Sequence, residues 1–233
     1  MKHLSFDSVR YARGGFELAA DGVFGPGIHL VSGRVGSGKS TFALLAAGQL
    51  SPVSGKISTR EISRAIVSMQ FPEYHVTGIT VRDEVSSWSP GPADVLETVR
   101  LAGRENDDIA TLSRGEMKRL HLSCVLSAGA DLLVLDEPFS SLDCTEKKFF
   151  SSEIAGHGSD IVIICTHEPL WLPDVDYIWE IRDGSLVSLG DLPGAIPGWD
   201  LAPGHIRDLV RAGRIPKNIS PGAVLEALCR TRG

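Results

Sequence analysis

Long hydrophobic runs are missing from this sequence of 233 residues. No apolar stretch approaches the roughly 18 residues that a membrane-spanning helix needs. The N-terminal segment MKHLSFDSVR alternates apolar and polar side chains like a β-strand, and it lacks the apolar core of a secretion signal. We therefore expect a cytoplasmic chain, whose contact with any membrane depends on a partner protein.

Cysteine is scarce, and basic charge is not in excess. The four cysteines, Cys124, Cys144, Cys165 and Cys229, lie far apart and form no C-x-x-C pair. We expect ordinary buried or half-buried thiols in a reducing compartment. The formal net charge of -6 argues against non-specific attraction to nucleic acid, so no nucleic-acid partner is expected.

Apolar strands alternate with helices through most of the chain. LSFDSVRY and FELAA predict two antiparallel strands joined by a turn at residues 13–15. The apolar runs GIHLVSG, AIVSMQ, DLLVLDEP and DIVIICTH predict buried strands, and the segments between several of them have helical spacing. This alternation predicts an α/β fold with a mostly parallel core sheet and an antiparallel N-terminal β subdomain.

Two regions depart from this alternation. Residues 71–128 begin with short helices broken near Pro90 and Gly91, which predicts a helical subdomain inserted into a domain of residues 1–190. YIWEIRDGSLVSLG predicts a β-hairpin with Asp183 and Gly184 at its turn. Residues 191–233 are rich in glycine and proline at first and then carry two short helical patterns, so we expect a small C-terminal helical appendage.

The segment SGRVGSGKST has the spacing of a phosphate-binding loop, and it stands between a predicted strand and a predicted helix. Glycines let consecutive backbone N–H groups surround a phosphate at the helix N-terminus. Lys39 is expected to neutralise the β- and γ-phosphates, and the Ser40 hydroxyl to bind Mg²⁺. The predicted nucleotide-binding residues are Gly33, Arg34, Gly36, Ser37, Gly38, Lys39, Ser40 and Thr41.

Two carboxylates end the predicted strand LLVLDEP. Asp136 is expected to hold Mg²⁺, and Glu137 to orient or deprotonate an attacking water. Capping of the next helix is the alternative role for both. Beside a phosphate loop on a neighbouring strand, the catalytic role is favoured.

Further motifs follow in a fixed order. Gln70 closes AIVSMQ, LSRGE occupies residues 112–116, Asp143 ends SSLD, and His167 lies in CTHEP. Alone, Gln70 and His167 are ordinary polar residues, but together these motifs resemble the nucleotide-binding subunit of ATP-binding-cassette (ABC) transporters over about residues 3–190. The resemblance implies an ATPase that uses ATP and Mg²⁺. It implies Gln70 as a Mg²⁺ contact, His167 as a catalytic residue with Glu137 and Lys39, and Asp143 at a dimer interface.

LSRGE is similar to the family signature LSGGQ. The resemblance implies that Ser113, Arg114, Gly115 and Glu116 contact ATP held by a second chain, identical or homologous. From the residues alone, Ser113 and Glu116 form a capping box, and this role is compatible with phosphate binding. Arg114 and Glu116 replace a glycine and a glutamine of the family pattern, which predicts a weakened site unless the guanidinium adds a phosphate contact.

Tyr11 in VRYARGG lies where the family carries an aromatic residue that stacks on adenine. The resemblance therefore implies that Tyr11 binds the nucleotide. An ordinary strand tyrosine at the edge of a sheet is the alternative.

MQFPEYHVTGITVRDEV resembles the corresponding region of energy-coupling-factor ATPases, which drive uptake of vitamins and of cobalt or nickel ions. The resemblance implies a transmembrane coupling protein and a substrate-binding membrane protein as partners, and a peripheral location at the inner face of the membrane. It also places Val81, Asp83 and Glu84 on a helix beside the coupling groove, where acidic groups meet a basic partner helix. A solvated helix face is the alternative for these acids.

Three functions are consistent with the sequence. The first is the ATPase of such an importer. The second is a non-transport ATPase of the same fold that acts on nucleic acid or ribosomes, although no basic surface or second cassette supports it. The third is a regulatory subunit with degenerate chemistry, which the departures at Arg114 and Glu116 suggest.

Overall fold

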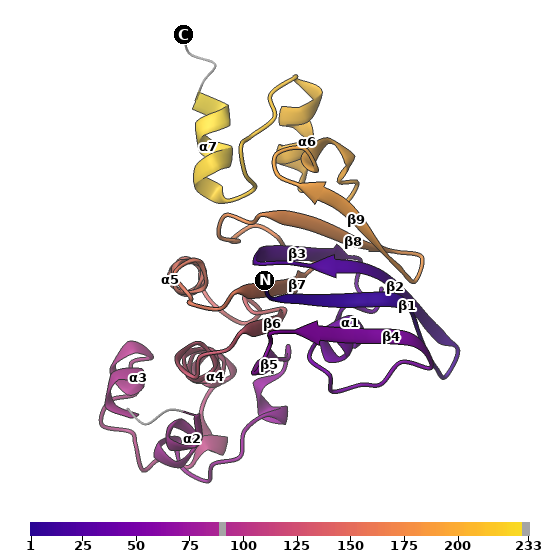
Figure 1. The fold of residues 1–233 in the computed structure, drawn as a ribbon. Coiled ribbons are helices and arrows are strands. Elements are labelled where there is room, and N and C mark those ends of the chain that lie inside the picture. Colours follow the sequence, from indigo (N-terminus) through magenta and orange to yellow (C-terminus); the bar gives the residue numbers. More distant parts are fainter. Residues whose placement is uncertain (89–91, 230–233) are drawn as a thin grey trace.

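The apolar runs of the sequence form the parallel core of a nine-stranded sheet in the computed structural model, which describes residues 1–88 and 92–229 (Figure 1). The strand order is β4-β1-β2-β9-β8-β3-β7-β6-β5. The parallel strands are β3 (Gly27–Gly33), β5 (Ala65–Ser68), β6 (Leu132–Asp136), β7 (Ile161–Thr166) and β8 (Tyr177–Arg182). Since parallel strands place their carboxyl ends at one edge, the polar residues that follow β3, β6 and β7 meet there.

The predicted N-terminal hairpin is confirmed. β1 (His3–Arg13) pairs antiparallel with β2 (Phe16–Phe24) and with β4 (Ser54–Arg60), a strand that the sequence did not predict. The helix α1 (Lys39–Ala46) packs between this part and the core strands through a buried cluster that includes Phe42 and Leu45. The predicted second hairpin is also confirmed, as β9 (Ser185–Asp191) pairs antiparallel with β8.

The strand predicted from AIVSMQ is less buried than expected. β5 is four residues long and lies at the end of the sheet, next to β6. Ile66 and Ser68 are buried, whereas Ala65 is exposed. The expectation of a buried strand is therefore wrong for one face, because the face that carries Ala65 and Val67 is only partly covered by the rest of the chain.

The inserted region forms short helices, α2 (Val81–Trp88) and α3 (Pro92–Thr98), which pack with α4 (Arg114–Ser127) around a hydrophobic cluster of their own. Two further residues of α4, Leu122 and Val125, instead belong to the main core, so α4 joins the helical region to the sheet. The predicted break at Pro90 and Gly91 lies outside the described residues. The helix α5 (Cys144–Ala155) lies beside α4 (Figure 1).

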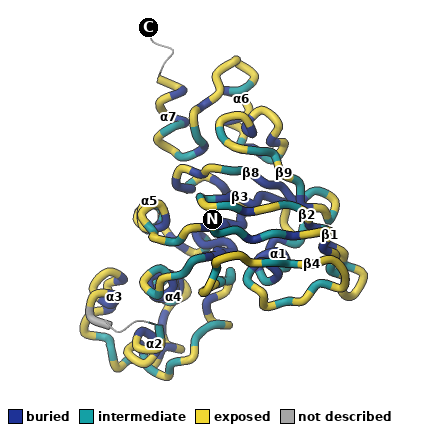
Figure 2. Tube along the Cα trace, in the orientation of Figure 1, coloured by how far each residue is buried: buried dark blue, intermediate teal, exposed yellow. Residues whose placement is uncertain are grey.

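The C-terminal helices α6 (Gly204–Arg211) and α7 (Pro221–Cys229) form as predicted. Buried residues of this region share the main hydrophobic cluster with the core strands (Figure 2). The Trp199 indole N–H also donates to Ser32 Oγ of β3 at 2.9 Å. The described part of this region, residues 191–229, is therefore packed onto the sheet by apolar burial and a buried hydrogen bond.

The cysteine prediction is correct for two residues and wrong for two. Cys124 and Cys165 are buried, whereas Cys144 and Cys229 are exposed, and all are free thiols. Cys144 opens α5 and Cys229 ends α7, and residues at helix ends are commonly accessible to water. Across the described part of the chain, no helix is long and apolar enough to cross a bilayer.

Candidate functional site

The predicted phosphate loop runs from Gly33, the last residue of β3, to Lys39 at the start of α1. Gly36 and Gly38 have φ angles of +79° and +106°, which glycine adopts at the lowest cost. A Cβ atom at Gly38 would lie 2.6 Å from Cζ of Phe16. The glycines thus allow a tight turn before the helix N-terminus, where free N–H groups favour an anion.

Lys39 is buried and bent back over this loop. Its Nζ donates to the carbonyl oxygens of Gly33 at 2.9 Å and Arg34 at 3.0 Å, and it lies 3.8 Å from Oε1 of Glu137. An ammonium has three donors, so it can exchange a carbonyl for a phosphate oxygen without leaving its position. The lysine is therefore placed between the loop and the candidate base.

Two cavities meet the loop and collect most of the predicted site residues. A cavity of about 320 Å³ is lined by predicted residues from separate parts of the chain, namely Gly36, Gly38, Lys39, Ser40, Thr41, Gln70, Glu137 and His167. A second cavity of about 600 Å³ is lined by Arg34, Gly36 and Ser37, together with the β8–β9 turn and residues 15–17. The fold thus assembles one candidate nucleotide site from residues that are distant in sequence.

Glu137 follows β6 in a left-handed conformation with a φ angle of +48°, which non-glycine residues rarely adopt. Three hydrogen bonds hold its carboxylate. Oε2 accepts from Thr166 Oγ1 at 2.8 Å, and Oε1 accepts from the His167 backbone N–H at 3.0 Å and lies 2.6 Å from His167 Nδ1. This arrangement fixes a carboxylate at the cavity and orients the histidine ring. The role of Thr166 was not predicted, because the hydroxyl has no distinctive sequence pattern.

Asp136 is fully buried at the end of β6. Within the described residues, neither of its carboxylate oxygens has a hydrogen-bond partner. Burial raises the pKa of Asp136, and the nearby Ser40 hydroxyl and Lys39 charge oppose this shift. A buried carboxylate with no well-formed hydrogen bond fits a bound cation, because a cation supplies further positive charge at the carboxylate oxygens.

The residues present therefore fit Mg²⁺. Ser40 and Gln70 line the 320 Å³ cavity, and Asp136 lies next to Ser40. Hydroxyl, amide and carboxylate oxygens are the ligands that this hard cation prefers, with water completing the shell.

The signature segment begins α4 with a complete capping box. The Ser113 backbone N–H donates to Oε2 of Glu116 at 2.8 Å, and the Glu116 N–H donates to Ser113 Oγ at 3.3 Å. The other oxygen of Glu116 accepts from Arg104 Nη1 at 2.6 Å. The hydrogen bonds from Ser113 and the Arg104 charge lower the pKa of Glu116.

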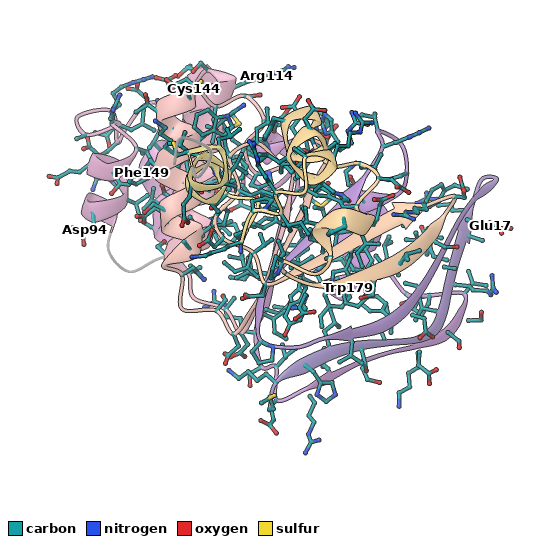
Figure 3. All side chains as sticks on the ribbon, turned by 90° about the horizontal axis from the view of Figure 1, so that it is seen from above. Glu17, Asp94, Arg114, Cys144, Phe149 and Trp179 are labelled. Atoms are coloured by element: carbon teal, nitrogen blue, oxygen red, sulfur yellow. The ribbon has the colours of Figure 1, made fainter. Side chains whose placement is uncertain are left out.

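Two consequences follow for the expected weakness of the signature. Glu116 is paired with Arg104, which also pairs with Asp107, so its negative charge is partly compensated before any nucleotide arrives. Arg114 is exposed at the start of the helix and is free to point outward (Figure 3). The electrostatic argument against Glu116 is therefore weaker than the sequence suggested.

The signature lies apart from the phosphate loop of the same chain. In Figure 3, Arg114 and Cys144 lie along one upper edge, whereas Glu17, which lines the larger cavity, lies at the opposite end of the molecule. Asp143, just before Cys144, is exposed and caps α5 by accepting from the N–H groups of Thr145 and Glu146 at 2.8 Å. The same chain thus presents two capped helix starts away from its own phosphate loop.

Tyr11 is half-buried against the N-terminal hydrophobic cluster, and it is not among the residues lining either cavity. Phe16, on the neighbouring strand, lines both cavities and contacts Gly38. The structure thus offers Phe16 as a second aromatic candidate for contact with a base. No distinct sequence signal marks Phe16, because its proximity to Gly38 depends on how β2 packs against the phosphate loop.

Of the two acidic residues of α2, Asp83 is exposed as expected, whereas Glu84 is buried. Glu84 is 1% exposed and accepts from the N–H groups of Thr77 at 2.8 Å and Gly78 at 2.9 Å and from Trp88 Nε1 at 2.8 Å. Asp83 accepts from the Thr80 N–H at 3.1 Å and so caps the same helix. Both roles that the sequence suggested for Glu84, contact with a basic partner helix and a place on a solvated helix face, are therefore wrong. Its carboxylate instead accepts hydrogen bonds from buried backbone donors.

Comparisons with known proteins agree with this geometry. The sequence model of the family described as ABC transporter matches residues 26–140. A protein of Halobacterium salinarum described as an ABC transporter ATP-binding protein is 31% identical over 207 residues, which cover 75% of this chain and 87% of the relative. The energy-coupling factor transporter ATP-binding protein of Thermotoga maritima is 31% identical over 180 residues, which cover 68% of this chain and 69% of the relative.

The fold is also shared with a solved structure. An inward-facing metal-chelate type ABC transporter superimposes with a TM-score of 0.60 at 20% sequence identity, over 82% of this chain and 84% of that one.

Proposed function

The chain belongs to the ABC transporter family of ATP-hydrolysing proteins, and from this membership we propose that it powers a membrane importer of the energy-coupling-factor type. The similarity to the Thermotoga maritima protein and the segment QFPEYHVTGITVRDEV support this choice. In such importers a separate membrane protein selects the vitamin or transition-metal ion. The solute of this chain is therefore to be found through its partners.

The observation that carries the proposed chemistry is the hydrogen-bonded position of Glu137 at the phosphate-loop cavity. Its carboxylate takes a proton from the water that attacks the γ-phosphate, while His167 keeps that carboxylate in place. Lys39 balances charge on the β- and γ-phosphates. Mg²⁺, held by Ser40, Gln70 and Asp136, supplies further charge neutralisation when bound.

We further propose that two chains share each ATP. The signature of one chain contacts the nucleotide on the phosphate loop of the other, which is consistent with the place of Arg114 at the opposite end of the molecule from Glu17. Ser113 caps α4 in the open state and contacts phosphate in the closed one. ATP then favours the closed dimer because it binds that state more tightly, and hydrolysis reopens it.

The segment after Gln70 is the proposed docking surface for the transmembrane coupling protein. Phe71, Tyr74 and Ile79 are 44%, 79% and 77% exposed, and the rings of Phe71 and Tyr74 lie 6.0 Å apart. Apolar side chains gathered on one exposed segment are typical of an interaction site. Since Gln70 begins this segment, a partner docked here lies next to the nucleotide site.

The test is a pull-down of the tagged Glu137→Gln chain from its native membranes, with Mg-ATP or with ADP. We expect the ATP sample to contain a transmembrane coupling protein, a cassette chain and a small membrane protein that identifies the solute. A Tyr74→Ala, Ile79→Ala variant is expected to lose these partners, whereas Val53→Ala, at an equally exposed apolar residue (70%), keeps them. Recovery of ribosomes, or of the chain alone, contradicts the importer proposal.

A further inference from the structure

Lys118 is a buried cation that the chemistry above does not use. It lies on α4, one helical turn after Arg114, and it is 1% exposed. Its Nζ donates to the backbone oxygens of Gln70 at 3.2 Å and Met69 at 3.5 Å. Within the described residues, no carboxylate oxygen lies within 4.0 Å of this ammonium. Two backbone carbonyls therefore hold the charge directly.

Keeping a cation in this position is costly. Burial lowers the pKa of Lys118 to about 8, while the more distant carboxylates of Asp136, Glu137 and Glu73 oppose the shift. An apolar side chain of similar length would fill the same space without the desolvation penalty. A buried charge with defined partners can instead specify one conformation, at the expense of stability.

The contacts of Lys118 fall where three functional segments meet. A small cavity of about 40 Å³ is lined by residues after β5, at the start of α4 and before α5, namely Gln70, Phe71, Pro72, Glu73, Arg114, Lys118, Ser140 and Ser141. The segment after β5 is attached to α4 at a second point. The Met69 N–H donates to His75 Nε2 at 3.3 Å, and the His75 ring stacks on His121 of α4 at 5.0 Å.

We propose that Lys118 is a positioning residue that fixes the backbone at Met69 and Gln70, and thereby holds the Gln70 side chain at the Mg²⁺ position of the cavity. The inference deepens the proposed function and rests on it. Because the same helix carries Ser113 and Arg114, the two hydrogen bonds also link the signature to the chain's own nucleotide site. A shift of Gln70 towards bound Mg²⁺ then moves α4, which acts on the ATP of the second chain.

The test compares Lys118→Met, which removes the donors at similar length, with Lys118→Gln, which keeps an amide donor but no charge. Lys56→Met, at an exposed lysine of β4, is the control. The first measurement is amide hydrogen exchange of residues 69–77 in the nucleotide-free chain. The second is the Mg²⁺ concentration that gives half-maximal ATPase activity at saturating ATP.

We expect Lys118→Met to speed exchange in residues 69–77. It is also expected to raise the half-maximal Mg²⁺ concentration about tenfold, which is at the lower end of the effect of losing hydrogen bonds from a charged donor. In Lys118→Gln, the exchange rate and the half-maximal Mg²⁺ concentration are both expected to lie close to those of the wild type. Lys56→Met is expected to match the wild type in both measurements. Equal behaviour of the methionine variant and the wild type in both measurements overturns the proposal. Equal damage in the methionine and glutamine variants overturns the hydrogen-bonding role.

A measurement on wild-type protein keeps the proposal testable if Lys118→Met does not fold. The Nζ signal of Lys118 in ¹⁵N NMR is assigned by its absence from Lys118→Gln. We expect it to shift when Mg²⁺ is added to the ATP-bound chain, and not to shift in Gln70→Ala; an unchanged wild-type signal overturns the proposal. These readouts need no membrane partner, so failure of the pull-down and failure of this inference are distinguishable.

Discussion

Replacing Glu137 by glutamine separates the chemical role of this residue from its structural role. Glutamine has the same size, and its amide oxygen can accept from the His167 N–H while its amide nitrogen donates to Thr166 Oγ1. Loss of the general base is expected to lower kcat by about 10²- to 10⁴-fold. Exchange of charge-assisted for neutral hydrogen bonds is expected to lower the free energy of unfolding by only about 1–2 kcal/mol.

The assay is phosphate release under saturating Mg-ATP, with ATP binding and urea unfolding measured on the same samples. Glu168→Gln is the matched control, because it removes the same charge from a 64% exposed side chain that lies 3.7 Å from His167 Nε2. We expect the control to keep kcat within about twofold, as surface charges usually contribute little. If Glu137→Gln kept a third or more of the wild-type kcat, or if the two variants lost activity equally, Glu137 would not be the base.

Three further predictions concern the nucleotide base, the N-terminal ion pair and the C-terminal region. Phe16→Ala is expected to raise the KM for ATP by about 5- to 100-fold, because we expect its ring to stack on the base. A larger increase in KM for Tyr11→Ala would show that Tyr11 stacks on the base instead. Hydrogen bonds from Lys2 and two backbone N–H groups lower the pKa of Asp131 from 3.8 to about 2, so their stabilisation is present above pH 4 and lost as the pH falls towards 2. In urea unfolding at a series of pH values, the difference in the free energy of unfolding between wild type and Asp131→Asn should become smaller as the pH falls from 4 towards 2. A difference that stays constant contradicts the assignment. Trp199→Ala is expected to lower the free energy of unfolding by about 3–5 kcal/mol, because the side chain is 2% exposed within the main core. A loss below about 1 kcal/mol would mean that residues 191–229 are only loosely attached.

Most of the fold was predictable because its signals are local. The apolar runs that became β3, β6 and β7, the turn glycines and the spacing around Lys39 each depend on residues within a few positions of one another. The capping box of Ser113 and Glu116 was found for the same reason, since both partners lie in one helical turn. β4 was missed because the exposed segment SGKISTR has little apolar content and gains its strand conformation by pairing with β1.

The sequence by itself determined the family of this protein: the order of its motifs marks the phosphate loop, the carboxylates at the end of β6 and the signature segment, because each motif requires particular residue types at short spacing. Tertiary structure alone decided which polar side chains are free to act. Glu84 accepts hydrogen bonds from buried backbone donors, Glu116 is paired with Arg104, and Lys118 donates to the carbonyl of Gln70. These partners come from other segments of the chain, and the free energy of a polar group depends on what surrounds it after folding, which no local pattern records.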